Sequence, residues 1–246
     1  MALYDRPVRM LMRDMIAELA PDPTAVFTRR DALRWFDHNY PKVKPGTVSA
    51  HLLRFSSNSA SRHHYNPRSD EALLYQLPDG RFRLHDPATD SAPSDGPPDD
   101  QEERVERDVT DLAAEASEFA YEHDLRDFLA RNLPLIEPGL RLYDEEGITG
   151  VEFPVGGRFV DILAVDQHGD LVVVELKVKR GYDRVVGQLL RYTAWLTQNL
   201  AEDGQQVRGM IIAREISPDL RLACSGLPHV ELYEYELAVT LERVAI

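Results

Sequence analysis

Apolar residues divide the 246-residue chain into two patterned regions, joined by a stretch that has almost none. Residues 1–85 and 112–246 repeat apolar positions at the spacing of helices and strands. Residues 86–111 combine Pro, Gly, Ser and acidic residues instead. A segment of this composition cannot offset its ordering entropy by burial. We therefore predict two domains joined by a flexible acidic linker.

Three helical patterns and one hairpin pattern follow one another in residues 1–85. Thr28 is a suitable N-cap for the second helix, Pro45 can start the third, and Pro78-Asp79-Gly80 is a turn between two strands. The helices are expected over Arg6–Leu19, Arg29–Asn39 and Gly46–Phe55, and the strands over Leu73–Leu77 and Arg81–Leu84. Three helices and a hairpin are the order of a winged helix, so we predict a small winged-helix-like α+β domain.

Residues 112–246 mix helical and strand patterns. We expect helices at Phe119–Asn132, Asp183–Asn199 and Pro218–Cys224, and strands at Arg141–Asp144, Phe159–Val165, Leu171–Val178, Arg208–Ala213 and Val230–Tyr235. Three strands in a meander, a crossover helix and a returning strand form a mixed sheet. The predicted fold class is therefore α/β, a mixed sheet flanked by helices.

The net charge of −14 is unevenly distributed. Residues 1–85 carry 13 Lys and Arg against 9 Asp and Glu, whereas residues 112–246 carry 13 against 23. The basic front region permits DNA binding, which the overall charge alone would argue against. No apolar run is long enough to span a membrane, and the N-terminus lacks the apolar core of a signal peptide. Because Cys224 is the one cysteine, we expect a reducing, cytoplasmic setting.

Asp161, Glu175 and Lys177 stand within runs of Val, Ile and Leu that are typical of buried strands. Such charges are costly to bury unless they meet one another or a metal. The turn-forming segment Gln167-His168-Gly169-Asp170 would fold one strand beside the other and bring the three side chains together. We expect Asp161 and Glu175 to bind Mg²⁺ or Mn²⁺ together with the Leu176 carbonyl, as in a metal-dependent phosphodiesterase. Lys177 would orient the attacking water; the alternative is a buried ion-pair network without catalysis.

Further residues of the back region are candidates for the same site. Gln188 and Tyr192 are four residues apart on a predicted helix and share a face. Glu122, near the start of the preceding predicted helix, could reach the metal directly or through water. Arg158 and Lys179 are candidates for phosphate contacts. For the helical positions the alternative is an ordinary helix face, since acids near a helix start are favoured in any case.

Polar side chains on and after the third helix of the front region are candidates for DNA contact. In a winged helix this helix enters the major groove, where its side chains contact phosphates and base edges. The candidates are Thr47, Ser49, His51, Arg54, Arg62 and Arg68. The alternative is a solvated helix face and a polar loop in a domain that binds other proteins.

Several blocks of the back region resemble the PD-(D/E)XK nuclease superfamily, and more narrowly the catalytic domain of the NucS (EndoMS) endonuclease family. They are HDLRDFLARNLPLIEPGLRLY, GRFVDILAVD and VVVELKVKRGYDRVVGQLLRYTAWLTQNL, within residues 121–200. The resemblance implies a restriction-endonuclease-like fold and DNA cleavage that depends on Mg²⁺ or Mn²⁺. It also implies the catalytic set Asp161, Glu175 and Lys177, with Gln188 and Tyr192 as a Q-x-x-x-Y helix and Glu122 as the helical acid.

The front region departs from that family. Its members that cut at mismatches resemble one another in a β-rich N-terminal domain, whereas residues 1–85 here have a winged-helix pattern. We therefore predict a DNA endonuclease of restriction, defence or repair, targeted by its winged helix. A mismatch-specific nuclease, and a DNA-binding regulator with a structural nuclease fold, are the alternatives. Double-strand cleavage requires two sites, so a homodimer is expected, although nicking requires only one.

Overall fold

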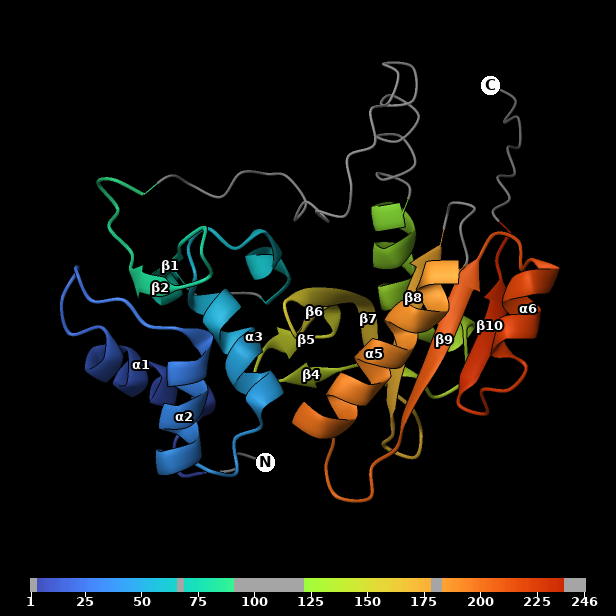
Figure 1. The fold of residues 1–246 in the computed structure, drawn as a ribbon, viewed down its shortest axis with the longest axis horizontal. Helices are drawn as coiled ribbons and strands as arrows, with labels where there is room; N and C mark the ends of the chain where they lie inside the picture. Colours follow the sequence, from blue (N-terminus) through green and yellow to red (C-terminus); the bar gives the residue numbers. More distant parts are fainter. Residues whose placement is uncertain (1–3, 66–68, 91–121, 178–182, 237–246) are drawn as a thin grey trace, which may run out of the picture.

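The computed structural model describes residues 4–65, 69–90, 122–177 and 183–236. Most of the predicted linker, together with Arg68 and Lys179, lies outside these residues. Two parts of the molecule lie side by side (Figure 1), and we call residues 4–90 the front domain and residues 122–236 the back domain. No helix in the described ranges combines the length and the apolar character that crossing a bilayer requires.

The front domain contains the three helices and the hairpin that its sequence predicts. Its elements are α1 (Val8–Leu19), α2 (Arg29–Asn39), α3 (Pro45–Phe55), η1 (Ala60–Tyr65), η2 (Ser69–Glu71), β1 (Leu74–Gln76) and β2 (Phe82–Leu84). Thr28 caps α2, because its hydroxyl accepts from the Asp31 amide at 3.2 Å while the Asp31 carboxylate accepts from the Thr28 amide at 2.9 Å. Phe27 pairs with Phe82, so the hairpin closes on the segment before α2. The domain therefore has the element order of a winged helix.

The back domain is built on a six-stranded mixed sheet in the order β10-β9-β8-β7-β3, with β6 also paired to β7. Its strands are β3 (Arg141–Leu142), β6 (Val151–Val155), β7 (Arg158–Val165), β8 (Leu171–Lys177), β9 (Val207–Ala213) and β10 (Val230–Glu234). The strands β8, β9 and β10 run parallel, connected by the crossover helices α5 (Asp183–Asn199) and α6 (Pro218–Cys224). The strands β3, β6 and β8 are antiparallel to β7. The predicted fold class is therefore confirmed.

Two local features of the sheet differ from the sequence prediction. The strand expected at Arg141–Asp144 is divided between β3 and a separate small hairpin of β4 (Asp144–Glu145) and β5 (Ile148–Thr149). The pattern also fails to predict β6, because Pro154 and the following Gly156-Gly157 are typical of a turn.

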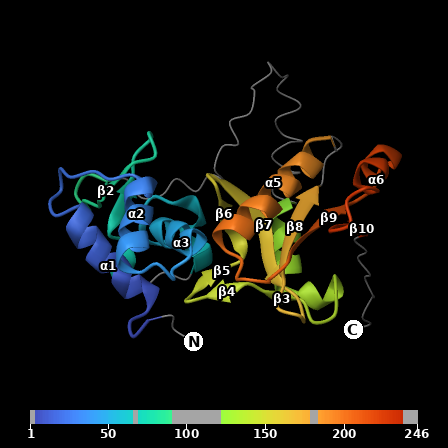
Figure 2. The same ribbon diagram turned by 60° about the horizontal axis from the view of Figure 1, so that its bottom comes forward.

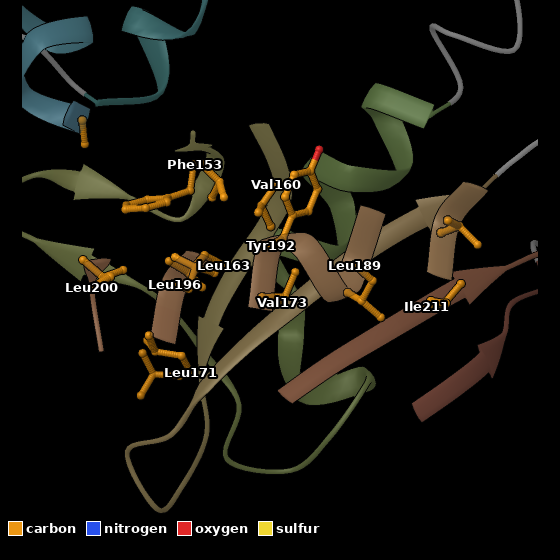
Figure 3. Close-up of a cluster of buried hydrophobic side chains, with 14 of the residues drawn as sticks. Phe153, Val160, Leu163, Leu171, Val173, Leu189, Tyr192, Leu196, Leu200 and Ile211 are labelled. Carbon is orange, nitrogen blue, oxygen red and sulfur yellow. The ribbon is translucent and has the colours of Figure 1, made fainter. Parts of the chain in front are cut away.

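Helices cover both faces of the sheet. On one face Leu189 of α5 packs in a buried cluster with Val173 of β8 (Figure 3). On the other face lies the helix over residues 122–131, in a second cluster that follows the η3 turn (Leu133–Leu135). Successive residues of β8 alternate between the two clusters, so Glu175 and Lys177 follow Val173 on the α5 face.

The two domains share part of their hydrophobic core. Ala50 of α3 and Tyr65 of η1 belong to the same buried cluster as Phe153 of β6. In both views α3 lies between the rest of the front domain and the back domain (Figure 2). At its start a Cβ on Gly46 would lie 3.1 Å from the Leu200 Cδ1 atom, so this close approach favours a residue without a side chain. The front domain is thus packed against the back domain as well as joined to it through the chain.

The sequence prediction of DNA contact requires the polar side chains of α3 to lie on the surface, but they do not. Each is buried, with at most 7 % of the residue exposed: Thr47, Ser49, His51 and Arg54. Two of them bind the back domain, since Thr47 Oγ1 donates to Glu145 Oε2 at 3.0 Å and Arg54 Nη1 donates to the Glu146 carbonyl at 2.9 Å. The prediction that these four side chains contact DNA is therefore wrong for this arrangement of the domains, because they face the protein interior.

Candidate active site

The catalytic candidates lie where β7 and β8 cease to pair. The register of the two strands ends at the pair Ile162–Val174, so Asp161 and Glu175 are the next opposed residues. Asp161 Oδ2 accepts a hydrogen bond from the Leu176 amide at 2.7 Å. Its carboxylate thus supplies an acceptor to β8 at the point where the backbone ladder stops. The short connection between the strands brings the two acids together, as the sequence predicts.

Glu175 is almost fully buried, with 2 % of the residue exposed. Its Oε1 atom lies 3.3 Å from the Lys177 ammonium, which is two residues further along the same face of β8. Its Oε2 atom is buried and has no hydrogen-bond partner among the described residues. A buried carboxylate oxygen without a donor is costly, so this atom marks a place where a ligand would be favourable.

The electrostatics of the three residues are strongly coupled. Burial raises the pKa of both carboxyls, and that of Glu175 rises further because the Asp161 charge lies beside it. Lys177 opposes these shifts without cancelling them. Burial alone would lower the pKa of Lys177, but Glu175, Asp161 and Glu122 together raise it. Ionisation of both carboxyls at the same time is therefore unfavourable, while Lys177 stays an ammonium.

Two candidates on α5 form a pair. Gln188 Nε2 donates to the Tyr192 hydroxyl at 2.9 Å, as expected for residues one helical turn apart. Tyr192 is buried and projects from α5 toward Val160 (Figure 3). Both side chains therefore lie on the sheet side of α5, and their role in catalysis stays a prediction.

Glu122 begins the described part of the helix over residues 122–131. Its charge contributes to the raised pKa of both Glu175 and Lys177, which places it in the electrostatic environment of the acid pair. Arg158, the first residue of β7, is half-buried. Lys179, the other predicted phosphate contact, lies outside the described residues.

The remaining predicted DNA contacts belong to the segment after α3. Arg62 turns toward the protein, because its Nε donates to the Arg54 carbonyl at 3.0 Å and its Nη2 is buried. Arg62 is half-buried, however, so its contact with DNA stays a prediction. Arg68 lies outside the described residues, so its contact stays a prediction.

Sequence reasoning missed one acid beside the site. Glu152 of β6 has a positive φ of 47°, which non-glycine residues rarely adopt. Its carboxylate contacts Arg126 Nη1 and lies 3.4 Å from His64 Nε2 of the front domain. The amino-acid pattern carries no signal for Glu152, since its conformation depends on residues far apart in the chain.

Among the residues that the structure describes, no three His, Cys, Asp or Glu side chains are grouped to hold a metal ion. The candidate site is instead a pair of carboxylates. Hard divalent cations such as Mg²⁺ accept backbone carbonyl and water oxygens beside one or two carboxylates.

The match to a family model covers the whole of this site. Residues 121–226 match the model described as "Endonuclease NucS C-terminal domain". The back domain is a NucS-like C-terminal domain. The matched residues include all six catalytic candidates: Glu122, Asp161, Glu175, Lys177, Gln188 and Tyr192. Residues 7–84 match a separate model described as "Domain of unknown function (DUF7669)".

Curated proteins and solved structures match part of this chain. The chain is 32 % identical over 96 residues to Endonuclease NucS of Pyrococcus furiosus, covering 39 % of this chain and 33 % of the relative. It is 31 % identical over 122 residues to Endonuclease NucS 2 of Halobacterium salinarum, covering 49 % and 45 %. The matches thus span less than half the length of these relatives.

The matches to solved structures cover a similar share of the chain. A repair endonuclease from Pyrococcus abyssi has 24 % identity and a TM-score of 0.38, covering 55 % of this chain and 50 % of its own. An EndoMS–dsDNA complex has 26 % identity and a TM-score of 0.40, covering 48 % and 46 %.

Proposed function

We propose that the protein is a metal-dependent DNA endonuclease with Asp161, Glu175 and Lys177 as its cleavage site. The observation that carries the proposal is the meeting of the half-buried Asp161 carboxylate, the buried Glu175 carboxylate and the Lys177 ammonium where β7 and β8 separate. They do so within a NucS-like domain, and the curated proteins that match part of this chain are named endonucleases. Repair, restriction and defence are the processes that such an activity would serve.

A Mg²⁺ or Mn²⁺ ion fits the residues present. Asp161 and Glu175 would hold it, with the Leu176 carbonyl as a third oxygen. The fit rests on the buried Glu175 Oε2 atom, which no described residue donates to, and on the raised pKa of two adjoining carboxyls. When bound, the ion would lower the pKa of a coordinated water and neutralise charge on the phosphate.

Each side chain of the chain itself has a distinct task in this proposal. Lys177 acts as a hydrogen-bond donor and a fixed positive charge, because its raised pKa disfavours the neutral amine that a general base requires. Its ammonium would bind a phosphoryl oxygen or the attacking water. Gln188 and Tyr192 would position that water or the scissile phosphate from α5. Glu122 would add a further carboxylate from its helix.

The front domain would add affinity for DNA through its excess of basic residues. The proposal rests on that charge and on the winged-helix order of its elements. It does not rest on the polar side chains of α3, because they are buried. The double variant Arg30→Gln, Lys42→Gln removes two exposed charges of this domain. If the domain contacts phosphate, the variant reduces the dependence of DNA affinity on salt. An unchanged salt slope would exclude these residues from the DNA contact.

Cleavage assays test the proposal directly. The full chain is incubated with supercoiled plasmid, a mismatched duplex and single-stranded DNA in the presence of Mg²⁺, Mn²⁺ or EDTA. We expect metal-dependent cleavage that Asp161→Ala and Glu175→Gln abolish. Cleavage of no substrate would reject the enzyme and, if binding persists, support the DNA-binding regulator.

A strong preference for the mismatched duplex would support the alternative, a mismatch-specific nuclease of the NucS type. We further propose a homodimer, because double-strand cleavage requires two sites. Light scattering at assay concentrations measures the mass, and a monomer that linearises plasmid would reject the dimer.

A further inference from the structure

Two non-glycine residues of the described chain have a positive φ: Glu146 at 51° and Glu152 at 47°. Both belong to the back domain, and both are bound by the front domain. A left-handed backbone at such residues persists only where surrounding contacts over-determine it, and such strain often accompanies function. The two glutamates therefore form a natural pair for comparison.

Glu152 interrupts the pairing of β6 with β7 beside Asp161. The strands pair at Val151–Ile162 and again at Phe153–Val160, in the same register. The position between these pairs would set Glu152 opposite Asp161, and no pair forms there. The unusual backbone of Glu152 is thus the immediate neighbour of a catalytic candidate.

The front domain contacts both the main chain and the side chain of Glu152. The Tyr65 hydroxyl donates to the Glu152 carbonyl at 3.0 Å, and Tyr65 is fully buried in the shared core. His64 Nε2 lies 3.4 Å from Glu152 Oε2. Both residues belong to η1, the segment that follows α3.

The same carboxylate also binds the helix that carries Glu122. Glu152 Oε1 pairs with Arg126 Nη1, and both side chains are largely buried. Arg126 follows Glu122 by one helical turn, so the two share a helix face. One ion pair therefore connects the strand beside Asp161 with the helix of the third acidic candidate.

We propose that Glu152 is a positioning residue of the nuclease site, and that Tyr65 and His64 of the front domain hold it in place. The front domain is then part of the cleavage machinery and not only a means of reaching DNA. This inference rests on the proposed endonuclease activity. The experiments below distinguish a failure of the positioning role from a failure of the endonuclease activity.

Kinetics of three single variants test the positioning role. Glu152→Gln weakens the Arg126 ion pair, and Tyr65→Phe removes the one hydroxyl that supports the Glu152 carbonyl. We expect kcat to fall about tenfold or more in Glu152→Gln and several-fold in Tyr65→Phe, with KM nearly unchanged, as for residues that orient a site.

Glu146→Gln is the matched control. Glu146 also has a positive φ, its carboxylate accepts from the Val8 amide at 2.6 Å, and its carbonyl accepts from Arg54 at 2.9 Å. It lies in the β4–β5 turn, and its described contacts are with Val8 and Arg54 and not with the three catalytic candidates. We expect its kcat to match the wild type. Equal losses of kcat in Glu152→Gln and Glu146→Gln would overturn the inference.

A double-mutant cycle separates the backbone from the carboxylate. Glycine adopts a positive φ without the steric cost of a Cβ, so it needs less support from Tyr65. Tyr65→Phe should therefore lower kcat less in the Glu152→Gly background than in the wild type. The same fold-loss in both backgrounds would show that Tyr65 does not act through the Glu152 backbone.

Amide hydrogen exchange provides a readout that does not depend on cleavage. We expect Tyr65→Phe to speed exchange in the helix over residues 122–131, and Glu146→Gln to leave it unchanged, when both variants melt as cooperatively as the wild type. If the wild type cleaves no DNA but exchange responds in this way, the endonuclease proposal fails and the positioning stands. If the wild type cleaves DNA and exchange in that helix is unchanged, the positioning fails alone.

Discussion

The strands β7 and β8 carry acidic residues at both of their paired ends, and the two ends are built differently. At the turn end, Asp166 accepts from the amides of His168 and Asp170 at 2.9 and 3.0 Å, and Arg208 lies 3.2 Å away. Burial alone would raise the pKa of Asp166, but these donors together lower it. At the opposite end, burial raises the pKa of Asp161, and burial together with the Asp161 charge raises the pKa of Glu175.

The difference shows that burial of an acid does not by itself mark a functional site. Asp166 is as buried as a catalytic candidate, but its oxygens have donors, and Arg208 also binds Glu137 and Glu231. That network is a sufficient reason for Asp166 to be charged. Glu175 pairs with Lys177 through Oε1 but keeps a buried Oε2 atom that no described residue donates to, so the described contacts satisfy only part of this carboxylate.

The largest contrast is expected in cleavage. Asp161→Asn and Glu175→Gln should each lower the cleavage rate by about 10³-fold or more, because they remove charge where the transition state needs it. Asp166→Asn should stay within about twofold of the wild type. Single-turnover rates on one duplex measure all three. A comparable loss of rate in Asp166→Asn would remove the functional distinction between the two ends.

The second contrast is expected in stability at the turn end. Arg208→Met should lower the free energy of unfolding by about 2–3 kcal/mol, since it leaves partly buried carboxylates without their cation. The exposed Arg221 is the matched control, and Arg221→Met should change the free energy by at most about 0.5 kcal/mol. Urea unfolding measures both, and equal values would contradict the structural role of the network.

The third contrast has the opposite sign. In metal-free protein at neutral pH, Glu175→Gln should raise the free energy of unfolding by about 1 kcal/mol. The reason is that a raised carboxyl pKa means that ionisation costs folding free energy, even with Lys177 beside it. Calorimetry in EDTA checks the sign. A lower melting temperature would mean that the ion pair with Lys177 outweighs the cost of the buried charge.

The smallest contrast concerns the pH dependence of Asp166. Its folded-state pKa is lowered, so the stability that its charge contributes is present above the unfolded-state pKa of about 3.9. That contribution is lost as the pH falls through the folded-state pKa. The difference in unfolding free energy between wild type and Asp166→Asn should therefore shrink between pH 5 and strongly acidic conditions. A difference that grows on acidification would contradict the assigned shift.

The convergence of Asp161 and Glu175 could be predicted from the sequence because it depends on local structure. A short hairpin connection, with Gly169 at a φ of 89°, fixes the register of the two strands over a few residues. The alternation of side chains along β8 then places Lys177 on the face of Glu175. Helix ranges were predictable for the same reason, since capping and apolar spacing are local.

The burial of α3 could not be predicted, because the partners of its polar residues are distant in the chain. Thr47 binds Glu145, and Arg54 binds Glu146 and Glu71. No periodicity of a helix or strand relates these positions in the sequence. A polar position on a helix has the same appearance whether it meets water or a buried carboxylate. The positive φ of Glu152 is equally hidden, since tertiary contacts stabilise it against its local preference.

The hydrogen bond from the Leu176 amide to Asp161 has an evolutionary consequence. A substitution of Asp161 by a residue without an acceptor oxygen also leaves a strand amide without its partner, which costs about 1–3 kcal/mol when buried. Among the described contacts, the Lys177 side chain makes no such hydrogen bond to the backbone. A homologue that has lost the proposed nuclease activity should therefore lose Lys177 before Asp161, so an intact Asp161 alone is weak evidence for that activity in a homologue.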